Sequence, residues 1–140
     1  MNIYFACSIT GGREFQPVYE SITRALLADG HEIPTAHLAE AGVVNEEKIV
    51  SPLAVYTRDT DWIRAAQSLI AEVSVPSHGV GYEVAFALGL GKPVLCLYQQ
   101  GRPVSKMITG NPDPNLKIVS YLTVEGAVRI AREFAVAKDL

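Results

Sequence analysis

The sequence predicts an α/β domain in which a parallel sheet of five strands carries helices on both faces. Two observations lead to this expectation. Short apolar segments alternate with segments of helical periodicity along the whole chain, which is the pattern of consecutive strand–helix units. The segment Pro93 to Tyr98 is apolar without interruption, as expected for a strand that is covered on both sides. A length of 140 residues fits one domain, residues 1–140, with enough side chains for a real core.

The first part of the chain predicts a strand, a helix and a second strand. Asn2 to Cys7 is short, apolar and rich in residues that favour strands. Val18 to Asp29 carries apolar residues at helical spacing, and Gly30 ends this helix. His31 to Thr35 predicts the second strand. Its proline, Pro34, indicates a position at the edge of the sheet, because proline cannot donate a ladder hydrogen bond.

The rest of the chain continues the alternation. Ser51 followed by Pro52 marks a helix start, because proline is tolerated at the first helical position. Gln99 to Asn115 contains two glycines and three prolines and predicts a loop, with a turn of helix near Ser105 to Ile108. Thr123 is expected to cap the last helix, which runs to about Ala137. The remaining expected elements are the helix Leu53–Ala66, the strand Ser68–Val73, the helix Gly79–Gly91 and the strands Pro93–Tyr98 and Leu116–Tyr121.

The expected arrangement of these strands is a doubly wound sheet of the flavodoxin-like or Rossmann-like type, with strand order 2-1-3-4-5. Crossovers between parallel strands are right-handed, which distributes the helices over both faces. In this arrangement the loops after the first and third strands meet where the strand order reverses. Ligands of such sheets bind at that point, so the candidate site is sought in these two loops.

Composition excludes several classes of partner. The net charge is −3 and no basic stripe is evident, so a nucleic acid polymer is not an expected partner. No apolar run approaches the roughly 20 residues that a membrane span needs. The beginning of the chain lacks the features of a signal peptide, which predicts a cytoplasmic protein. The two cysteines and three histidines have no spacing typical of a metal site, so no metal is expected.

The loop after the first strand is a candidate phosphate site. Ser8, Thr10, Gly11 and Gly12 can bring backbone N–H groups and two hydroxyls close to an anion, and Arg13 adds a positive charge. The alternative is an ordinary turn between a strand and a helix, where paired glycines are common. The spacing matches neither a Walker loop nor a complete dinucleotide fingerprint, so both interpretations stay open.

The most informative segment runs from Ser77 to Glu83 and reads Ser-His-Gly-Val-Gly-Tyr-Glu. It follows an apolar strand and places Glu83 in the first turn of the expected helix. A carboxylate at this edge of the sheet can attack an anomeric carbon when a second acid handles protons. Asp59, next to Arg58 in the preceding helix, is the candidate second acid, although the sequence barely separates it from Asp61 two residues further on. The alternatives are a carboxylate that interacts with the helix dipole for Glu83, and a solvated ion pair for Asp59.

Taken together, these residues resemble the nucleoside 2-deoxyribosyltransferase superfamily, and within it most closely the 2'-deoxynucleoside 5'-phosphate N-hydrolases. The resemblance covers nearly the whole chain, and its most specific part is the run from Ser77 to Glu83. The other segments that carry it are Tyr4-Phe5, Ser8-Ile9, Gly11-Gly12-Arg13-Glu14, Asp59 with Trp62, Ala71-Glu72-Val73, and Ser105-Lys106-Met107-Ile108 with Gly110.

The resemblance implies a role for each matching residue. Glu83 would attack C1' of the deoxyribose and form a glycosyl ester that water hydrolyses. Asp59 would assist proton transfer, and Tyr4 would lie close to the sugar and the nucleophile. Ser105 would reach the phosphate of the neighbouring subunit of a homodimer. No metal or organic cofactor is implied. The matching residues expected to bind the substrate are Ser8, Ile9, Thr10, Gly11, Gly12, Arg13, Ser77, Gly79, Ser105 and Met107.

One position departs from this pattern. Close relatives carry an arginine where this chain has Thr10, and losing a guanidinium removes a strong contact to a phosphate. Arg13 or Lys106 could substitute. The expected activity is hydrolysis of a small-molecule 2'-deoxynucleoside 5'-monophosphate to free base and 2-deoxyribose 5-phosphate. A deoxyribosyltransferase, a ribonucleotide N-glycosidase acting on CMP and a sensor that binds nucleotides without catalysis are the alternatives.

Overall fold

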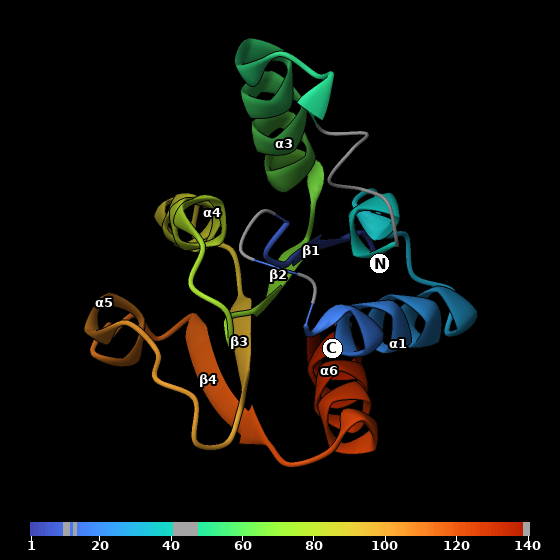
Figure 1. The fold of residues 1–140 in the computed structure, drawn as a ribbon, viewed down its shortest axis with the longest axis vertical. Coiled ribbons are helices and arrows are strands. Elements are labelled where there is room, and N and C mark those ends of the chain that lie inside the picture. The colour runs from blue at the N-terminus through green and yellow to red at the C-terminus, as the bar shows by residue number, and fades with distance from the viewer. Residues whose placement is uncertain (10–11, 13, 41–47, 139–140) are drawn as a thin grey trace.

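The computed structural model describes residues 1–9, 12, 14–40 and 48–138 of the chain. Its centre is a parallel sheet in the order β1-β2-β3-β4 (Figure 1). The predicted α/β fold with a parallel sheet is confirmed, and these four strands lie within one residue of their expected bounds. The strands are β1 (Ile3–Ala6), β2 (Ser68–Glu72), β3 (Val94–Gln99) and β4 (Leu116–Tyr121).

The predicted second strand, and with it the five-stranded order 2-1-3-4-5, is wrong. Only an isolated parallel bridge joins Asn2 to Glu32 beyond the outer edge of β1. It consists of hydrogen bonds from the Ile3 N–H to the Glu32 carbonyl and from the Glu32 N–H to the Met1 carbonyl, both 2.9 Å long. The next bond of such a ladder would come from the amide of Pro34, which has no hydrogen to donate. The segment therefore lies beside β1 without forming a strand.

Thr35 replaces the missing ladder with its side chain. The Phe5 N–H donates to Thr35 Oγ1 over 3.0 Å, and the same hydroxyl donates to the Phe5 carbonyl over 2.7 Å. Thr35 is fully buried, so these bonds satisfy two backbone groups that water cannot reach. The outer edge of β1 is therefore hydrogen-bonded to a side-chain hydroxyl at Phe5, and not to the backbone of a neighbouring strand.

Helices cover both faces of the sheet, as predicted (Figure 1). On one face α1 (Gln16–Ala28) packs against α6 (Val124–Lys138), and both contribute to a core with Ile3 and Phe5 of β1. On the other face lie α3 (Pro52–Ala65) and α4 (His78–Gly89). The short helices are η1 (Ala36–Ala39) and α5 (Lys106–Thr109). Strand alternation directs Tyr4 and Ala6 to the face of α3 and α4.

Three of these helices have a serine as N-cap residue, whose side chain accepts a hydrogen bond from the first turn. Ser51 Oγ accepts from the Ala54 N–H at α3, and Ser105 Oγ accepts from the Met107 N–H at α5. Ser77 Oγ accepts from the Val80 N–H over 3.3 Å at α4. Because α4 begins at His78, Glu83 lies in its second turn and not in the first, as the sequence suggested.

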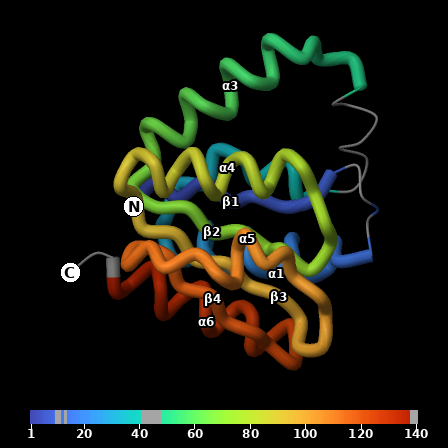
Figure 2. Tube along the Cα trace, turned by 90° about the vertical axis from the view of Figure 1, so that its left-hand side faces the viewer, coloured from blue at the N-terminus to red at the C-terminus, as the bar shows by residue number. Residues whose placement is uncertain are grey.

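The two helices on the second face diverge. Figure 2 shows α3 leaning away from α4 at the end where it begins, while its other end lies close to the sheet. Burial follows this tilt, because the buried residues of α3, Thr60 and Ile63, lie in its second half. Between the diverging helices lies a wedge-shaped space, which residues of α3 and α4 line together with Cys7 and Ile9 just after β1. Within the described residues, no helix combines the length and apolar character needed to cross a bilayer.

Candidate active site

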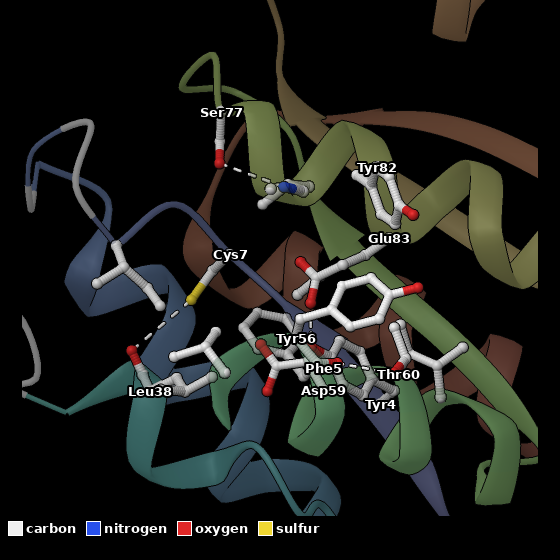
Figure 3. Close-up of a pocket in the computed structure, with 16 residues that line it drawn as sticks. Tyr4, Phe5, Cys7, Leu38, Tyr56, Asp59, Thr60, Ser77, Tyr82 and Glu83 are labelled. Carbon is white, nitrogen blue, oxygen red and sulfur yellow. Dashed lines mark hydrogen bonds between the residues drawn. The ribbon is translucent and has the colours of Figure 1, made fainter. Parts of the chain in front are cut away.

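The wedge between α3 and α4 holds a cavity of about 390 Å³. Its wall includes Asp59 from α3, Glu83 from α4 and Tyr4 from β1, three of the residues singled out in the sequence (Figure 3). Two carboxyl groups from different helices therefore line one hollow at the carboxyl end of the sheet. The rest of the lining is mainly apolar, and comes from Phe5, Ala6, Cys7, Ile9, Leu38, Val55, Tyr56, Thr60, Ile63, Ser77, Gly79, Val80 and Tyr82.

Tyr4 and Glu83 are joined directly. The Tyr4 hydroxyl donates a hydrogen bond to Glu83 Oε2 (Figure 3). Tyr4 is buried in the middle of β1, so its ring is fixed by the sheet and its hydroxyl holds one carboxylate oxygen in place. The second oxygen, Oε1, carries no hydrogen bond from Tyr4. This arrangement orients a carboxylate while leaving one of its oxygens for another contact.

The environment of Glu83 opposes its ionisation. Burial in the apolar cavity raises the pKa of its carboxyl to about 7, and the nearby charge of Asp59 also raises it. The hydrogen bond from Tyr4 and the charge of Arg58 act in the opposite direction. For Tyr4, burial and the Glu83 charge raise the pKa of the phenol far above its usual range, so it remains a hydrogen-bond donor. A carboxyl that titrates near neutral pH is typical of catalytic groups.

Asp59 is oriented by its neighbour in the helix. Arg58 Nε donates to Asp59 Oδ1 over 2.8 Å, and the side chain of Asp59 is 16% exposed. The Arg58 guanidinium lies over the ring of Trp62, 5.1 Å from its centroid, and this cation–π contact helps to fix its position. Asp61, by contrast, pairs with Arg64 on the surface and does not line the cavity. The structure thus separates two acids that the sequence hardly distinguished.

The residues predicted to bind the substrate are distributed unevenly. Ser77, Gly79 and Ile9 line the cavity, whereas Ser8 is fully buried and is not part of its wall. Gly12 has φ of 107°, a left-handed conformation that favours glycine, and it also lies outside the wall. The remaining members of this set, Thr10, Gly11 and Arg13, lie outside the described residues.

Ser105 and Met107 do not reach this cavity within one chain. They line a neighbouring groove of about 690 Å³ between α4 and the segment around α5. The groove shares Ser77, Val80 and Tyr82 with the cavity between α3 and α4, so the two hollows adjoin along the first turns of α4. Met107 is 85% exposed at the rim of this groove.

Two tyrosines of the cavity were not predicted. Tyr56 of α3 and Tyr82 of α4 meet edge to face, with ring centroids 6.4 Å apart, and close one side of the wedge. Tyr82 also stacks on Phe86 at 6.3 Å. The signal for Tyr56 was its position three residues before Asp59, which places both on one side of a helix.

Metal-ligating side chains are not gathered in the described part of the chain. There, no group of three or more His, Cys, Asp or Glu residues is placed to hold a metal ion.

The sequence profile of the nucleoside 2-deoxyribosyltransferase family matches residues 3–128. The chain belongs to this family. Among its relatives is the 5-hydroxymethyl-dUMP N-hydrolase of Mus musculus, 43% identical over 138 residues, which cover 95% of this chain and 79% of the mouse protein. A Methanococcoides burtonii protein provisionally named 2'-deoxynucleoside 5'-phosphate N-hydrolase 1 is 37% identical over 118 residues, covering 84% of this chain and 97% of that protein. The resemblance found in the sequence is confirmed.

Solved structures of the family's fold agree. The CMP N-glycosidase BcmB of Clostridium botulinum superimposes with a TM-score of 0.75 at 19% identity, covering 96% of this chain and 99% of that chain. The 2-deoxyribosyltransferase of Bacillus psychrosaccharolyticus gives a TM-score of 0.63 at 19% identity, covering 91% and 90% of the two chains. At this identity the likeness extends to the fold, which is the Rossmann-like arrangement described above.

Proposed function

We propose that this protein hydrolyses the N-glycosidic bond of 2'-deoxynucleoside 5'-monophosphates, giving the free base and 2-deoxyribose 5-phosphate. The observation that carries the proposal is the meeting of Glu83, Tyr4 and Asp59 at one cavity between α3 and α4. The names of relatives at about 40% identity, which describe N-hydrolases of deoxynucleotides, support the reaction and the substrate class.

Glu83 acts as the nucleophile in this proposal. One carboxylate oxygen bonds to C1' of the sugar while the bond from C1' to the base nitrogen breaks, and the bonding electrons leave with the base. The base takes up a proton from solvent, water then attacks C1' of the glycosyl ester and releases the Glu83 carboxylate, and the proton that this water loses returns to solvent through Asp59. The hydrogen bond from Tyr4 supports this role, because it fixes Oε2 and leaves Oε1 for the carbon.

Asp59 handles the protons. Its carboxylate lies in the cavity wall and is held by Arg58, so it can accept a proton from the attacking water and position the departing base. The 5'-phosphate is placed at the beginning of α4. There Ser77 Oγ already accepts a helix N–H, which leaves its hydroxyl hydrogen for a phosphate oxygen.

The proposed assembly is a cytoplasmic homodimer in which Ser105 and Met107 of one chain complete the site of the other. The apolar side chains exposed around the two hollows support a second copy as the occupant. Tyr56 is 49% exposed, Tyr82 is 56% exposed and Met107 is 85% exposed. A single chain, moreover, places Ser105 on the groove and not on the cavity.

Base release from a panel of nucleotides tests the activity. Deoxynucleoside and ribonucleoside 5'-monophosphates are compared with the matching nucleosides, and Asp59→Asn is compared with Asp61→Asn as the matched control on the same helix. We expect cleavage of at least one deoxynucleotide, a loss of about a hundredfold or more for Asp59→Asn and little change for Asp61→Asn. Exchange of the base in the presence of a second free base would instead indicate a transferase. Binding without base release would indicate a sensor.

Subunit complementation tests the shared site. Glu83→Gln and Ser105→Glu chains are inactive as separate homodimers if each site needs Glu83 from one chain and Ser105 from the other. A mixed dimer then contains one site free of both substitutions, so mixing should restore up to about half of the activity per mixed dimer. No recovery, with exchange of subunits verified by mass, would refute the shared site without affecting the proposed chemistry.

A further inference from the structure

Glu72 is a buried carboxylate that the proposed chemistry does not use. It is the last residue of β2, is 0% exposed, and pairs in register with Leu97 of the core on the α1 and α6 face. Glu83 lies across the sheet from it, on the other face. A carboxylate in such a place is costly unless it is fully hydrogen-bonded. Its partners therefore indicate what it contributes.

Three hydrogens are donated to Glu72. The Ser74 N–H donates to Oε1 over 2.8 Å, the Ser74 hydroxyl to Oε2 over 2.8 Å, and the Tyr121 hydroxyl to Oε2 over 2.5 Å. Ser74 Oγ in turn accepts from the Gln99 N–H over 2.8 Å. One carboxylate thus connects the ends of β2, β3 and β4 at the edge of the sheet where the cavity lies.

Arg102 extends this connection to the first loop. Its backbone N–H donates to the Gln99 carbonyl over 3.1 Å, at the residue whose own N–H donates to Ser74 Oγ, and its positive charge opposes the burial that raises the pKa of the Glu72 carboxyl. The same guanidinium makes an ion pair with Glu14 and lies 4.8 Å from the ring centroid of Phe15. Glu14 and Phe15 stand immediately before α1, at the end of the loop after β1.

These contacts join the three segments that carry the predicted phosphate-binding residues. The loop after β1 carries Ser8 and the loop after β2, residues 73–77, carries Ser77, while the segment after β3 leads from Arg102 to Ser105, which the proposed dimer presents to the site of the other chain. We propose that Glu72 and Arg102 are positioning residues that set the spacing of these segments and thereby the affinity for the 5'-phosphate. The inference rests on the proposed function, because it names which part of the nucleotide is affected.

The proposal predicts that substitutions of Glu72 and Arg102 weaken binding of the 5'-phosphate and change the rate of bond cleavage much less. Glu72→Gln keeps the shape of the side chain but turns one of its two acceptor oxygens into an N–H₂ group. If that group faces the Ser74 and Tyr121 hydroxyls, two donors must rearrange. Arg102→Gln removes the ion pair at the surface without disturbing the core. Displacement of a binding loop by a fraction of an ångström is enough to weaken a charge-assisted contact about tenfold or more.

The experiment measures binding and turnover separately. The dissociation constants of 2-deoxyribose 5-phosphate and of 2-deoxyribose are determined by calorimetry. In parallel, KM and kcat are determined for the best deoxynucleoside 5'-monophosphate. Arg129→Gln, which removes a surface guanidinium paired with Glu133 on α6, is the control. For both variants we expect binding of the phosphorylated sugar to weaken about tenfold, KM to rise in parallel and kcat to change less than about threefold. The control should resemble the wild type.

Two results would overturn the proposal. One is unchanged affinity for 2-deoxyribose 5-phosphate in folded Glu72→Gln and Arg102→Gln proteins. The other is a loss of kcat or of melting temperature with no change in affinity, which would make the network purely structural. If Glu72→Gln does not fold, the half-exposed Arg102 decides alone. Because calorimetry needs no turnover, a wild-type protein that binds the phosphorylated sugar but releases no base would refute the proposed function and leave this inference testable.

Discussion

Replacing Glu83 with glutamine should make the protein more stable at alkaline pH while abolishing catalysis. The cavity raises the pKa of the Glu83 carboxyl from the ordinary 4.5 to about 7, because burial disfavours the charged form. Between these two pH values the native protein binds the proton more tightly than the unfolded chain does, so stability falls as the pH rises. Above pH 7 this effect makes the free energy of unfolding about 3 kcal/mol smaller than it is at acidic pH, where Glu83 is protonated in both states. Glutamine resembles the protonated form at every pH.

Thermal unfolding at a series of pH values measures this difference. For a protein of this size 1 kcal/mol corresponds to roughly 3 °C in melting temperature. Glu83→Gln should therefore match the wild type near pH 4, melt about 3 °C higher at pH 5 and melt about 5–10 °C higher at pH 8. The other titrating groups are common to both proteins and cancel in the comparison. Glu133→Gln, which removes an exposed carboxylate, should differ from the wild type by roughly 2 °C or less throughout.

A difference in melting temperature that stays constant from pH 5 to pH 8 would contradict this reasoning. So would a Glu83→Gln protein that is less stable than the wild type at pH 8. Either result would mean that the Glu83 carboxyl is solvated in the native protein. The cavity would then lack the apolar environment on which the proposed nucleophile depends.

The remaining predictions concern the pH dependence of activity and the edge of the sheet. kcat/KM of the wild type should rise with pH as Glu83 ionises, with a midpoint near 7. Tyr4→Phe should move this midpoint upward, because it removes a hydrogen bond that lowers the pKa of Glu83. Asp59→Asn should move it downward, because it removes a charge that raises that pKa. Thr35→Val should cost about 2–4 kcal/mol of unfolding free energy, measured in urea, because two buried backbone groups lose their partner. Thr23→Val should cost less than about 1 kcal/mol, because its hydroxyl bonds only to carbonyls within its own helix.

The alternation of apolar and helical segments was sufficient to predict the fold, and it failed where one residue interrupts a ladder. His31 to Thr35 has the composition of a strand and does lie beside β1. Its pairing ends after one bridge because Pro34 lacks an N–H. The sequence pattern does not tell whether such a proline marks an edge strand or the end of pairing. The closure of that edge by Thr35 depends on a contact between residues distant in the chain, which no local pattern reports.

The sequence singled out Tyr4, Asp59 and Glu83, which line one cavity, but it did not give their geometry. Glu83 stood out because it follows a strand in a glycine-rich helix start, a pattern that local sequence does report. Asp59 and Asp61 could not be separated, since they lie on different sides of α3 and only the packing of this helix decides which side faces the cavity. The role of Glu72 was also hidden, because its partners Ser74 and Tyr121 come together only when three strands are aligned.

In the proposed mechanism the apolar wall around Glu83 both lowers the stability of the folded protein above neutral pH and favours the transition state. An apolar wall that raises the pKa of Glu83 also strengthens the attraction between its ionised form and a sugar that becomes positively charged at C1'. Water around an exposed carboxylate would screen that attraction in the transition state. The hydrogen bond from Tyr4 limits the cost, because it stabilises the ionised form enough to keep it populated near neutral pH. The tilt of α3, which leaves the wedge open, is therefore the element of the fold on which the proposed chemistry depends.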